Sequence, residues 1–500
     1  MRARNLSGGV VHPARRVIAM DGAIEDTICA VATPAGEGGI GIVRISGRDA
    51  LCVAGQIVRL RSNQPLDGVA SHSLHLADIV FPKQSGHLGD FGSNRPNRAG
   101  ELIDEGLVVF MKGPRSYTSE DSVEIHCHGG SVVLDLVCQA CLGAGARLAQ
   151  PGEFTKRAFL NGRLDLSQAE AVLDTIRSKS DAALKLAQRH LRGELGRHVD
   201  RLRATLVGLL AQVEAGIDFT EEDISFVGRD ELANSLKDTR RAIRVMLDAA
   251  EHGRRLQEGA RVVIAGRPNV GKSSLLNSFL GEERAIVTEI PGTTRDVLEG
   301  SVVWNGMMMT LVDTAGLRET GDVVEQEGMR RTRLALEQGD LVLHVVDAAE
   351  LERCPGEDTG PLPGSQRCIT VINKSDLVST DRIMDLVHMM KARTDGTVIP
   401  ISVRARAGLE ALRASIQSQL AHRTLEPTEP VTITKTRHRD ALERAEASLA
   451  EALNSIDNGA GPEFIAMDLR DAADALGEVT GVITSDDILH RIFSEFCIGK

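Results

Sequence analysis

The chain has 500 residues, of which 42% are hydrophobic and 26% charged, so its length suits about three globular domains with sizeable cores. Its formal net charge is −12 and only 3% of its residues are aromatic, which excludes a protein that attracts RNA by overall charge or stacks many bases on aromatic rings. No apolar run approaches the ~18 residues that a membrane-spanning helix needs.

The N-terminal part divides into two segments. Residues 1–20 contain four arginines and no acidic residue, and they lack the apolar run of a secretory signal. We expect either a disordered extension there or a true start at Met20. Residues 21–160 mix short β-branched runs with glycine-rich turns, which favours an α+β domain.

Two helical stretches flank a central segment of different character. Leu, Ala, Arg and Glu recur at spacings of three and four over residues 161–258 and again within 424–500. We therefore expect one all-α domain into which a separate domain, residues 259–423, is inserted. Two separate helical hairpins are the alternative.

A phosphate-binding loop begins the inserted segment. Residues 266–273 read GRPNVGKS and fit G-x-x-x-x-G-K-[ST], with an apolar strand pattern before them and a helical pattern after. Backbone N–H groups of such a loop and the helix N-terminus bind phosphates. We expect Lys272 to reach the β- and γ-phosphates and Ser273 to bind magnesium. The expected nucleotide contacts are Asn269, Val270, Gly271, Lys272, Ser273 and Ser274.

The base-recognition motifs point to guanine. The sequence Asn373-Lys374-Ser375-Asp376 follows an apolar strand pattern, and a carboxylate such as that of Asp376 can accept both adjacent N–H donors of guanine. The last base-contacting loop is Ser402-Val403-Arg404, which also follows an apolar strand pattern. GTPases usually have Ala where this chain has Val403, and the backbone contact remains possible.

Two further segments are typical of γ-phosphate sensing. Asp313-Thr314-Ala315-Gly316 ends a strand pattern, so that Asp313 would hold magnesium through water and the Gly316 N–H would contact the γ-phosphate. The preceding switch reads GTTRD, and its Thr294 is the expected second magnesium ligand. The alternative for Thr294 is a solvated loop residue.

The hydrolysis machinery differs from that of Ras-type proteins. Those proteins place a water-orienting Gln directly after the D-T-A-G motif, where this chain has the apolar Leu317. Glu319, Glu325 and Glu327 are nearby candidates for orienting the water, and the sequence alone does not choose among them.

No arginine finger is evident to neutralise the transferring phosphoryl group. Arg295 and Arg318 could equally be solvated loop charges. A monovalent cation is another solution, and Asn269 in the phosphate loop offers a side-chain oxygen for it.

Four segments outside the GTPase motifs carry a family resemblance. The first, from Asp26, reads DTI and continues with GGIGIVRISG, and the second, from Gln150, reads QPGEFT and continues with RAFLN. The third, from Leu164, reads LDLSQAEA, and the last, from Phe496, reads FCIGK. With the GTPase motifs, they make residues 26–500 resemble the MnmE (also called TrmE) family of tRNA-modifying GTPases. The resemblance implies an α+β folate-binding-like N-terminal domain, an all-α domain and an inserted Ras-like α/β P-loop GTPase domain.

The resemblance also implies a potassium site and a catalytic acid. The potassium ligands would be Asn269, Thr288, Ile290 and Thr293, and a V-E-x-x-G element selects Glu325 as the residue that orients water. The family usually has Asp and Ala where this chain has Glu289 and Pro291; Pro291 stiffens the loop and could alter cation affinity. The nucleotide-contacting loop comprises Thr288, Glu289, Ile290, Pro291, Gly292, Thr293 and Thr294.

For the N-terminal domain and the tail, the resemblance implies a tetrahydrofolate site. Its contacts would be Arg44, Glu124, Arg163 and Lys500, and the family usually has Lys where this chain has Arg163. The alternative for Arg44 is a surface arginine at a strand end. Cys497 is a possible reactive thiol, or else a small apolar residue packed against the folate pocket.

The implied function is a potassium-stimulated, magnesium-dependent GTPase in the cytoplasm. As a homodimer with an MnmG-like flavoprotein that carries FAD, it would place a carboxymethylaminomethyl or aminomethyl group on C5 of the wobble uridine of certain tRNAs. The carbon would come from 5,10-methylene-tetrahydrofolate. A ribosome-assembly GTPase and a folate-dependent one-carbon enzyme regulated by GTP are the alternatives.

Overall fold

The computed structural model describes residues 26–83, 98–218, 228–282, 298–314, 330, 334–355, 367–394, 396–420 and 432–500. It divides into two compact units. One comprises Met1–Leu173, His190–Thr239 and Ala441–Lys500, and the other comprises Asp174–Arg189 and Arg240–Asp440. The dividing points fall within helices, so the domain boundaries expected from the sequence stay a prediction.

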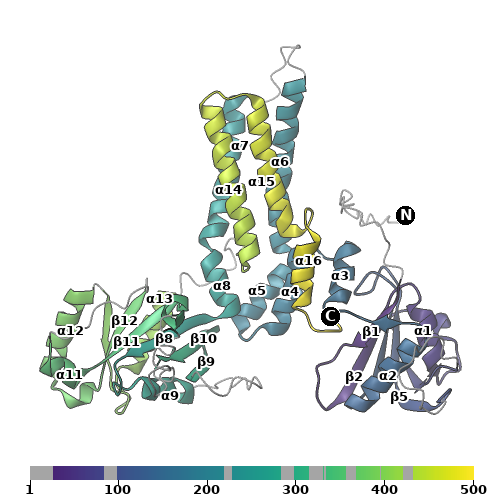
Figure 1. Ribbon diagram of the computed structural model, residues 1–500, viewed down its shortest axis with the longest axis horizontal. Helices are drawn as coiled ribbons and strands as arrows, with labels where there is room; N and C mark the ends of the chain where they lie inside the picture. The colour runs from purple at the N-terminus through teal and green to yellow at the C-terminus, as the bar shows by residue number, and fades with distance from the viewer. Residues whose placement is uncertain are drawn as a thin grey trace, which may run out of the picture. The chain divides into compact units, whose positions relative to one another are not determined.

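A seven-stranded sheet forms the N-terminal part of the first unit (Figure 1). Its strand order is β3-β4-β5-β6-β2-β1-β7, and all neighbours are antiparallel except β1 and β7. The strands are β1 Ile28–Val31, β2 Gly38–Ser46, β3 Val58–Leu60, β4 Leu74–Val80, β5 Leu102–Met111, β6 Ser122–Gly129 and β7 Arg147–Leu148.

Helices cover one face of this sheet. Alternation along β2 directs Val43 and Ile45 into a core beneath α1 (Ala50–Ile57) and α2 (Ser131–Gly143). The same alternation places Arg44 on the opposite face. A short 3-10 helix, η1 (Leu66–Gly68), adds to the core through Leu66.

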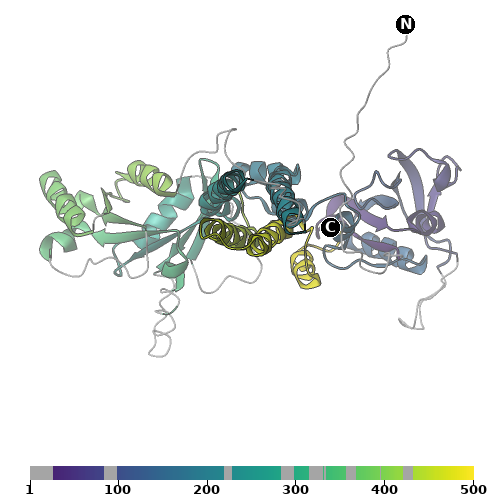
Figure 2. The ribbon, with the colours of Figure 1, turned by 90° about the horizontal axis from the view of Figure 1, so that it is seen from above.

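The rest of the first unit is helical. Helices α6 (Glu194–Asp218) and α15 (Pro462–Thr480) lie side by side, and Figure 2 shows the long helices nearly end-on. Arg203 Nε on α6 donates to the carbonyl oxygen of Ala473 on α15 at 3.2 Å. Besides α1 and α2, the other helices wholly or partly in this unit are α3 Glu153–Leu160, α4 Leu166–Arg177, the end of α5 Asp181–Leu191, α7 Arg229–Asp248, α14 Thr436–Asp457 and α16 Asp486–Ser494.

A six-stranded sheet forms the centre of the second unit. Its order is β13-β12-β11-β8-β10-β9, with every pair parallel except β9 and β10. The strands are β8 Ala260–Gly266, β9 Leu298–Trp304, β10 Met307–Asp313, β11 Leu341–Asp347, β12 Cys368–Asn373 and β13 Thr397–Pro400. The carboxyl ends of β8, β11 and β12 meet at one edge, where α/β sheets bind their ligands.

Helices pack around this sheet, and with it they give the expected Ras-like α/β fold. They are α5 Asp181–Leu191, α8 Ala250–Glu258, α9 Lys272–Glu282, α11 Ala348–Arg353, α12 Thr380–Thr394 and α13 Leu409–Leu420, with a 3-10 helix η3 at Ser375–Leu377. The expected combination of an α+β domain, helices and a GTPase-like domain is confirmed. Within the described ranges, no helix has the length and apolar character to cross a bilayer.

Candidate functional site

The phosphate loop turns at two glycines that approach neighbouring segments closely. Gly266 has φ 150°, and a Cβ atom there would lie 2.2 Å from the carbonyl oxygen of Val345. Gly271 has φ 99°, and a Cβ atom there would lie 2.3 Å from Nδ2 of Asn373. Both positions therefore require glycine. Asn269, between them, also has a left-handed backbone, with φ 63°.

Lys272 and Ser273 are the last residues of the phosphate loop and the first of helix α9. Lys272 is buried, and its Nζ donates to the carbonyl oxygens of Gly266 at 3.0 Å and Arg267 at 2.7 Å. Ser273 Oγ donates to Oδ2 of Asp313, a fully buried carboxylate at the end of β10, at 2.5 Å. The two oxygens predicted to serve magnesium, one directly and one through water, thus lie side by side.

Asn373 joins the base-recognition loop to two other segments. Its Nδ2 donates to the carbonyl oxygen of Val270 at 2.8 Å, and its Oδ1 accepts from the backbone N–H of Val403 at 3.3 Å. The side chain is buried where β12 ends. One amide therefore holds three of the predicted nucleotide-binding segments together.

Lys374 and Asp376 extend the same loop. Lys374 Nζ donates to the carbonyl oxygen of Asn269 at 2.9 Å and forms an ion pair with Oδ2 of Asp347 at 2.6 Å. Asp376 Oδ1 accepts from Ser402 Oγ at 2.5 Å, while the aspartate remains solvent-exposed. This bond orients a carboxylate that a ligand can reach.

The phosphate loop, the base-recognition loop and the loop at Ser402 line a cavity of about 330 Å³, which has room for a purine base. Its lining contains residues that the sequence predicted to contact GTP, with one addition, Leu377. Leu377 offers an exposed apolar surface directly after the base motif. The lining residues are Gly271, Ser274, Asn373, Lys374, Asp376, Leu377, Ser402, Val403 and Arg404.

Of the D-T-A-G motif, Asp313 and Thr314 are described. Thr314 Oγ1 donates to the carbonyl oxygen of Ile264 at 2.9 Å, so its hydroxyl ties β10 to β8. The remaining predicted residues of the GTPase site lie outside the described residues. They are Thr288, Glu289, Ile290, Pro291, Gly292, Thr293, Thr294, Ala315, Gly316 and Glu325.

A second cluster, in the first unit, centres on Arg44. Its Nε and Nη2 both lie 2.8 Å from Oε1 of Glu124, and its Nη1 donates to the carbonyl oxygen of Gly499 at 3.4 Å. The guanidinium carbon lies 5.4 Å from the ring centre of Tyr117 and 5.6 Å from that of Phe154. With 14% of its side chain exposed, Arg44 is not a surface arginine, and that alternative is wrong.

Lys500 lies in the same cluster. Burial lowers the pKa of its ammonium, the positive charge of Arg44 lowers it further, and Glu124 offsets part of the shift. Three of the four predicted folate contacts therefore come together from β2, β6 and the end of the chain. Two cations, Arg44 and Lys500, lie there beside the carboxylate of Glu124.

Arg163 contacts the cluster through Tyr117. Its Nη1 donates to the carbonyl oxygen of Tyr117 at 2.6 Å, and its guanidinium carbon lies 5.0 Å from the ring centre. A cavity of about 440 Å³ opens there, lined by His72, Met111, Pro114, Arg115, Ser116, Tyr117 and Arg163. The guanidinium groups of Arg44 and Arg163 therefore both contact the ring of Tyr117.

The C-terminal tail is held at two points. Phe496 is buried against the core of α3, α4 and α16, with its ring centre 5.7 Å from that of Phe493. A Cβ atom on Gly499 would lie 2.1 Å from the carbonyl oxygen of Val31, so the tail lies directly against β1. Cys497, between these anchors, is exposed. Both roles expected for Cys497, a reactive thiol or a small apolar residue against the folate pocket, stay predictions.

Comparison with known proteins decides the family. The model described as "MnmE helical domain" matches residues 166–497, and that described as "GTP-binding protein TrmE N-terminus" matches residues 27–163. A tRNA modification GTPase MnmE from Heliobacterium modesticaldum is 45% identical over 482 residues, covering 95% of this chain and 100% of that protein. This chain belongs to the MnmE family of tRNA modification GTPases.

Other members of the MnmE family are similarly close. The tRNA modification GTPase MnmE of Symbiobacterium thermophilum is 46% identical over 477 residues, covering 95% of this chain and 100% of that protein. Among solved structures, that of a probable GTP-binding protein engB aligns with a TM-score of 0.26 and 20% identity, covering 33% of this chain and 100% of that chain.

Motif analysis missed four residues of these clusters. Asp347, Leu377 and Tyr117 belong to none of the quoted motifs, and Phe154 lies within QPGEFT but had no predicted role. Each contacts or adjoins a predicted site residue. Asp347 had one available signal in the sequence, an acidic residue directly at the end of an apolar strand pattern, where α/β sheets bind their ligands. For Tyr117 and Phe154 the contacts to Arg44 depend on packing between distant segments.

Proposed function

We propose that this protein hydrolyses GTP and acts in tRNA modification. The observation that carries the proposal is the cavity around which the phosphate loop and the base-recognition loop meet. Asp376 presents a carboxylate there, held by Ser402, that can accept both N–H donors on the edge of guanine. Lys272 and the N-terminus of α9 supply the positive potential that phosphates require.

The residues described at the phosphate end fit a magnesium ion. A buried carboxylate and a hydroxyl, Asp313 and Ser273, lie within hydrogen-bonding distance of each other, and hard oxygen donors suit Mg²⁺. Ser273 would bind the ion directly, Asp313 through water, and Thr294 would supply the second hydroxyl. Bound there, the ion would supply charge neutralisation on the phosphates.

We extend the proposal to potassium as the substitute for an arginine finger. Asn269 is the one proposed ligand among the described residues; it is exposed on the phosphate loop, and Lys374 holds its carbonyl group. Thr288, Ile290 and Thr293 would complete the set, and Glu325 would orient the attacking water.

The Arg44 cluster is the proposed tetrahydrofolate site. Its fit rests on two cations, Arg44 and Lys500, which suit the carboxylates of a folate, and on the aromatic rings of Tyr117 and Phe154. Glu124 would serve the pterin N–H groups. Bound there, 5,10-methylene-tetrahydrofolate would supply the one-carbon unit.

The proposed reaction adds a carboxymethylaminomethyl or aminomethyl group to C5 of the wobble uridine in certain tRNAs. It would take place in the cytoplasm, on a homodimer working with an MnmG-like flavoprotein that carries the FAD. GTP hydrolysis would drive a conformational change of the GTPase domains rather than the carbon chemistry.

A base-specificity exchange tests the guanine site. Asp376→Asn replaces the two acceptor oxygens of the carboxylate with one acceptor oxygen and one NH2 donor. This pair suits xanthine, because xanthine carries an oxygen at C2 where guanine carries an amino group. We expect GTP turnover to fall and XTP turnover to rise, whereas Asp381→Asn, on the exposed first turn of α12, should change neither. Undiminished GTP turnover in Asp376→Asn would reject this site.

GTP turnover in matched potassium and sodium buffers tests the proposed hydrolysis mechanism. We expect strong stimulation by potassium, lost in Glu325→Ala. Equal rates in both salts would reject a cation site at Asn269 and leave an arginine or an external activator as the source of the positive charge.

Two other functions have distinct signatures. A ribosome-assembly GTPase would bind ribosomal particles in a nucleotide-dependent way without modifying tRNA. A one-carbon enzyme regulated by GTP would transfer the carbon unit to an acceptor other than tRNA. Analysis of the modified uridine in tRNA incubated with this protein, the flavoprotein and methylene-tetrahydrofolate separates both from the proposed function.

A further inference from the structure

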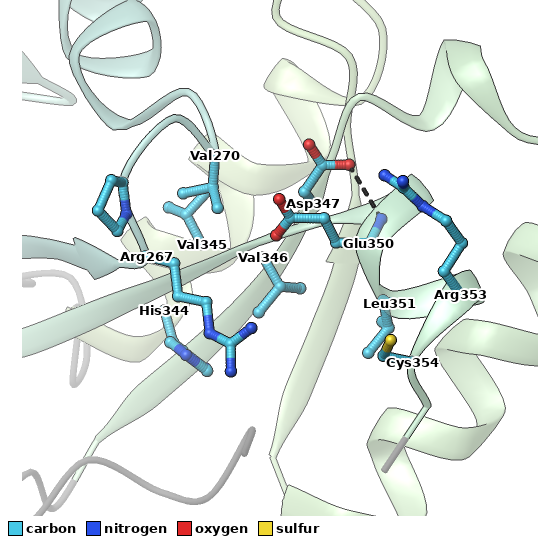
Figure 3. Close-up of a pocket in the computed structure, with 11 residues that line it drawn as sticks. Arg267, Val270, His344, Val345, Val346, Asp347, Glu350, Leu351, Arg353 and Cys354 are labelled. Carbon is cyan, nitrogen blue, oxygen red and sulfur yellow. Dashed lines mark hydrogen bonds between the residues drawn. The ribbon is translucent and has the colours of Figure 1, made fainter. Parts of the chain in front are cut away.

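Asp347 ends strand β11 next to the nucleotide site. Figure 3 shows it between Val270 of the phosphate loop and the first turn of α11, at the edge of a cavity of about 450 Å³. The parallel register of β11 and β12 places Asp347 opposite Asn373. The carboxylate therefore emerges beside the base-recognition loop, and it is buried there.

The two oxygens of Asp347 have separate partners. Oδ1 accepts from the backbone N–H groups of Ala349 at 2.9 Å and Glu350 at 3.4 Å, which caps helix α11. Oδ2 forms the 2.6 Å ion pair with Lys374 Nζ. Because the cap fixes the side-chain rotamer, the second oxygen is held toward the lysine.

The balance of charge keeps this carboxylate ionised. Burial by itself would raise the pKa of Asp347, but Lys374 and the backbone N–H groups of the cap outweigh it and lower the pKa below its ordinary value of 3.8. An ionised, immobile partner is therefore present at neutral pH for Lys374.

Lys374 needs such a partner to stay on the phosphate loop. Its side chain is 36% exposed, and a lysine ammonium on a flexible stem otherwise extends into water. Here Nζ also donates to the carbonyl oxygen of Asn269 at 2.9 Å. Asn269 has a left-handed backbone, and this hydrogen bond holds its peptide group in place.

We propose that Asp347 is a positioning residue for nucleotide binding, which acts by holding Lys374 against the phosphate loop at Asn269. The inference rests on the proposed guanine site and adds to it an acidic residue outside every GTPase motif of the sequence. Since GTP and GDP share the base and the loop, loss of Asp347 should weaken both alike.

A purely structural role for Asp347, as the cap of α11, makes a different prediction. Asn and Ser cap helices about as well as Asp, so Asp347→Asn and Asp347→Ser keep the cap while they remove the charge that holds Lys374. If capping were the only role, both variants would bind nucleotide like the wild type. Asp347→Ala would remove the cap and the ion pair together.

The test is a double-mutant cycle on the full-length protein, with a fluorescent GDP analogue as the probe. We expect Asp347→Asn to bind the GDP analogue about tenfold more weakly than the wild type. The double variant, which combines Asp347→Asn and Lys374→Ala, should bind it no more weakly than Lys374→Ala alone. Asp347→Ser provides the same comparison should the Asn variant fold poorly. Glu350→Gln, on the exposed face of the same helix, is the matched control and should bind normally.

Turnover adds a second readout. We expect the KM for GTP to rise in Asp347→Asn, with kcat within about threefold of the wild type, because Asp347 does not contact the phosphates. If Asp347→Asn binds nucleotide normally while Lys374→Ala binds it weakly, the positioning role is overturned but the guanine site is not. The same holds if the affinity losses of the two single variants multiply in the double variant. Normal binding by Lys374→Ala would overturn the guanine site as well.

Discussion

Asn373 Nδ2 lies 2.8 Å from the carbonyl oxygen of Val270, although the two residues are 103 positions apart in the chain. The same nitrogen lies 2.3 Å from where a Cβ atom on Gly271 would stand. The phosphate loop and the base-recognition loop therefore form one packed arrangement, and the absence of a side chain at Gly271 is what lets the bond form.

Gly271→Ala should abolish this contact. The added Cβ would collide with Asn373, and φ 99° is unfavourable for alanine, so either the loop or the base motif must move. We expect GTP affinity to fall about 100-fold or more, measured by binding of a fluorescent GTP analogue. Gly281→Ala, on helix α9, which begins directly after Gly271, has open space around it and should bind GTP normally. Equal affinities for the two variants would contradict the close approach.

Glu153→Gln should destabilise the N-terminal part of the first unit. Glu153 accepts from Arg147 at 2.6 Å and from the fully buried Arg157 at 3.0 Å. We expect unfolding by denaturant at pH 7 to show a loss of about 1–3 kcal/mol. Asp26→Asn should cost less, because Asp26 meets the same two arginines with 45% of its side chain exposed.

The effect of Glu153→Gln should also depend on pH. Burial raises the pKa of Glu153, but bonds from Arg147, Gln150 and Arg157 outweigh it and lower the pKa below its ordinary 4.5. A carboxylate with a lowered pKa stabilises the fold above the unfolded-state pKa, and this stability is lost as the pH falls through the folded-state pKa. The difference between wild type and variant should therefore shrink below about pH 4.5. A constant difference from pH 7 to pH 3 would reject this origin.

Binding of a folate at the Arg44 cluster should take up protons at high pH. Burial and Arg44 lower the pKa of Lys500 from 10.5, and a bound carboxylate would raise it again. At a pH between the lowered pKa of free Lys500 and 10.5, Lys500 therefore holds more protons in the folate-bound protein than in the free protein. The affinity for folate then falls as the pH rises through that range. Calorimetry with 5-formyl-tetrahydrofolate in buffers of different ionisation enthalpy measures the uptake, which Lys500→Gln should remove. Proton release on binding would contradict the assignment.

Phe496→Ala should release the C-terminal tail. The ring is 4% exposed, and its truncation removes packing against Phe493 and the core of α3, α4 and α16, at a cost of about 3 kcal/mol. We expect weaker folate binding as well, because Gly499 and Lys500 follow the anchor. Ile498→Ala, at a side chain 58% exposed, should change neither property. Thermal unfolding and folate calorimetry of the two variants provide the comparison.

The GTPase motifs were readable from the sequence because each acts through local geometry. A phosphate loop needs its glycines, lysine and hydroxyl within a few consecutive residues, and the strand and helix patterns on either side fix its context. The fold class followed for the same reason, since strand and helix periodicities are local. The ligand roles of the site residues, the potassium site and Glu325 among them, stay predictions.

The sequence by itself determined the family, the order of the motifs and the residue types that a guanine nucleotide requires, because these are written in short contiguous patterns. Only the tertiary structure decided that Asp347 holds Lys374 and that Arg44 contacts Glu124 and Gly499. Those pairings arise from strand register and from packing of segments up to 455 residues apart, as for Arg44 and Gly499. The lowered pKa of Lys500, and the part of the lowered pKa of Asp347 that is due to Lys374, follow from the same packing between separate segments, which no local pattern encodes.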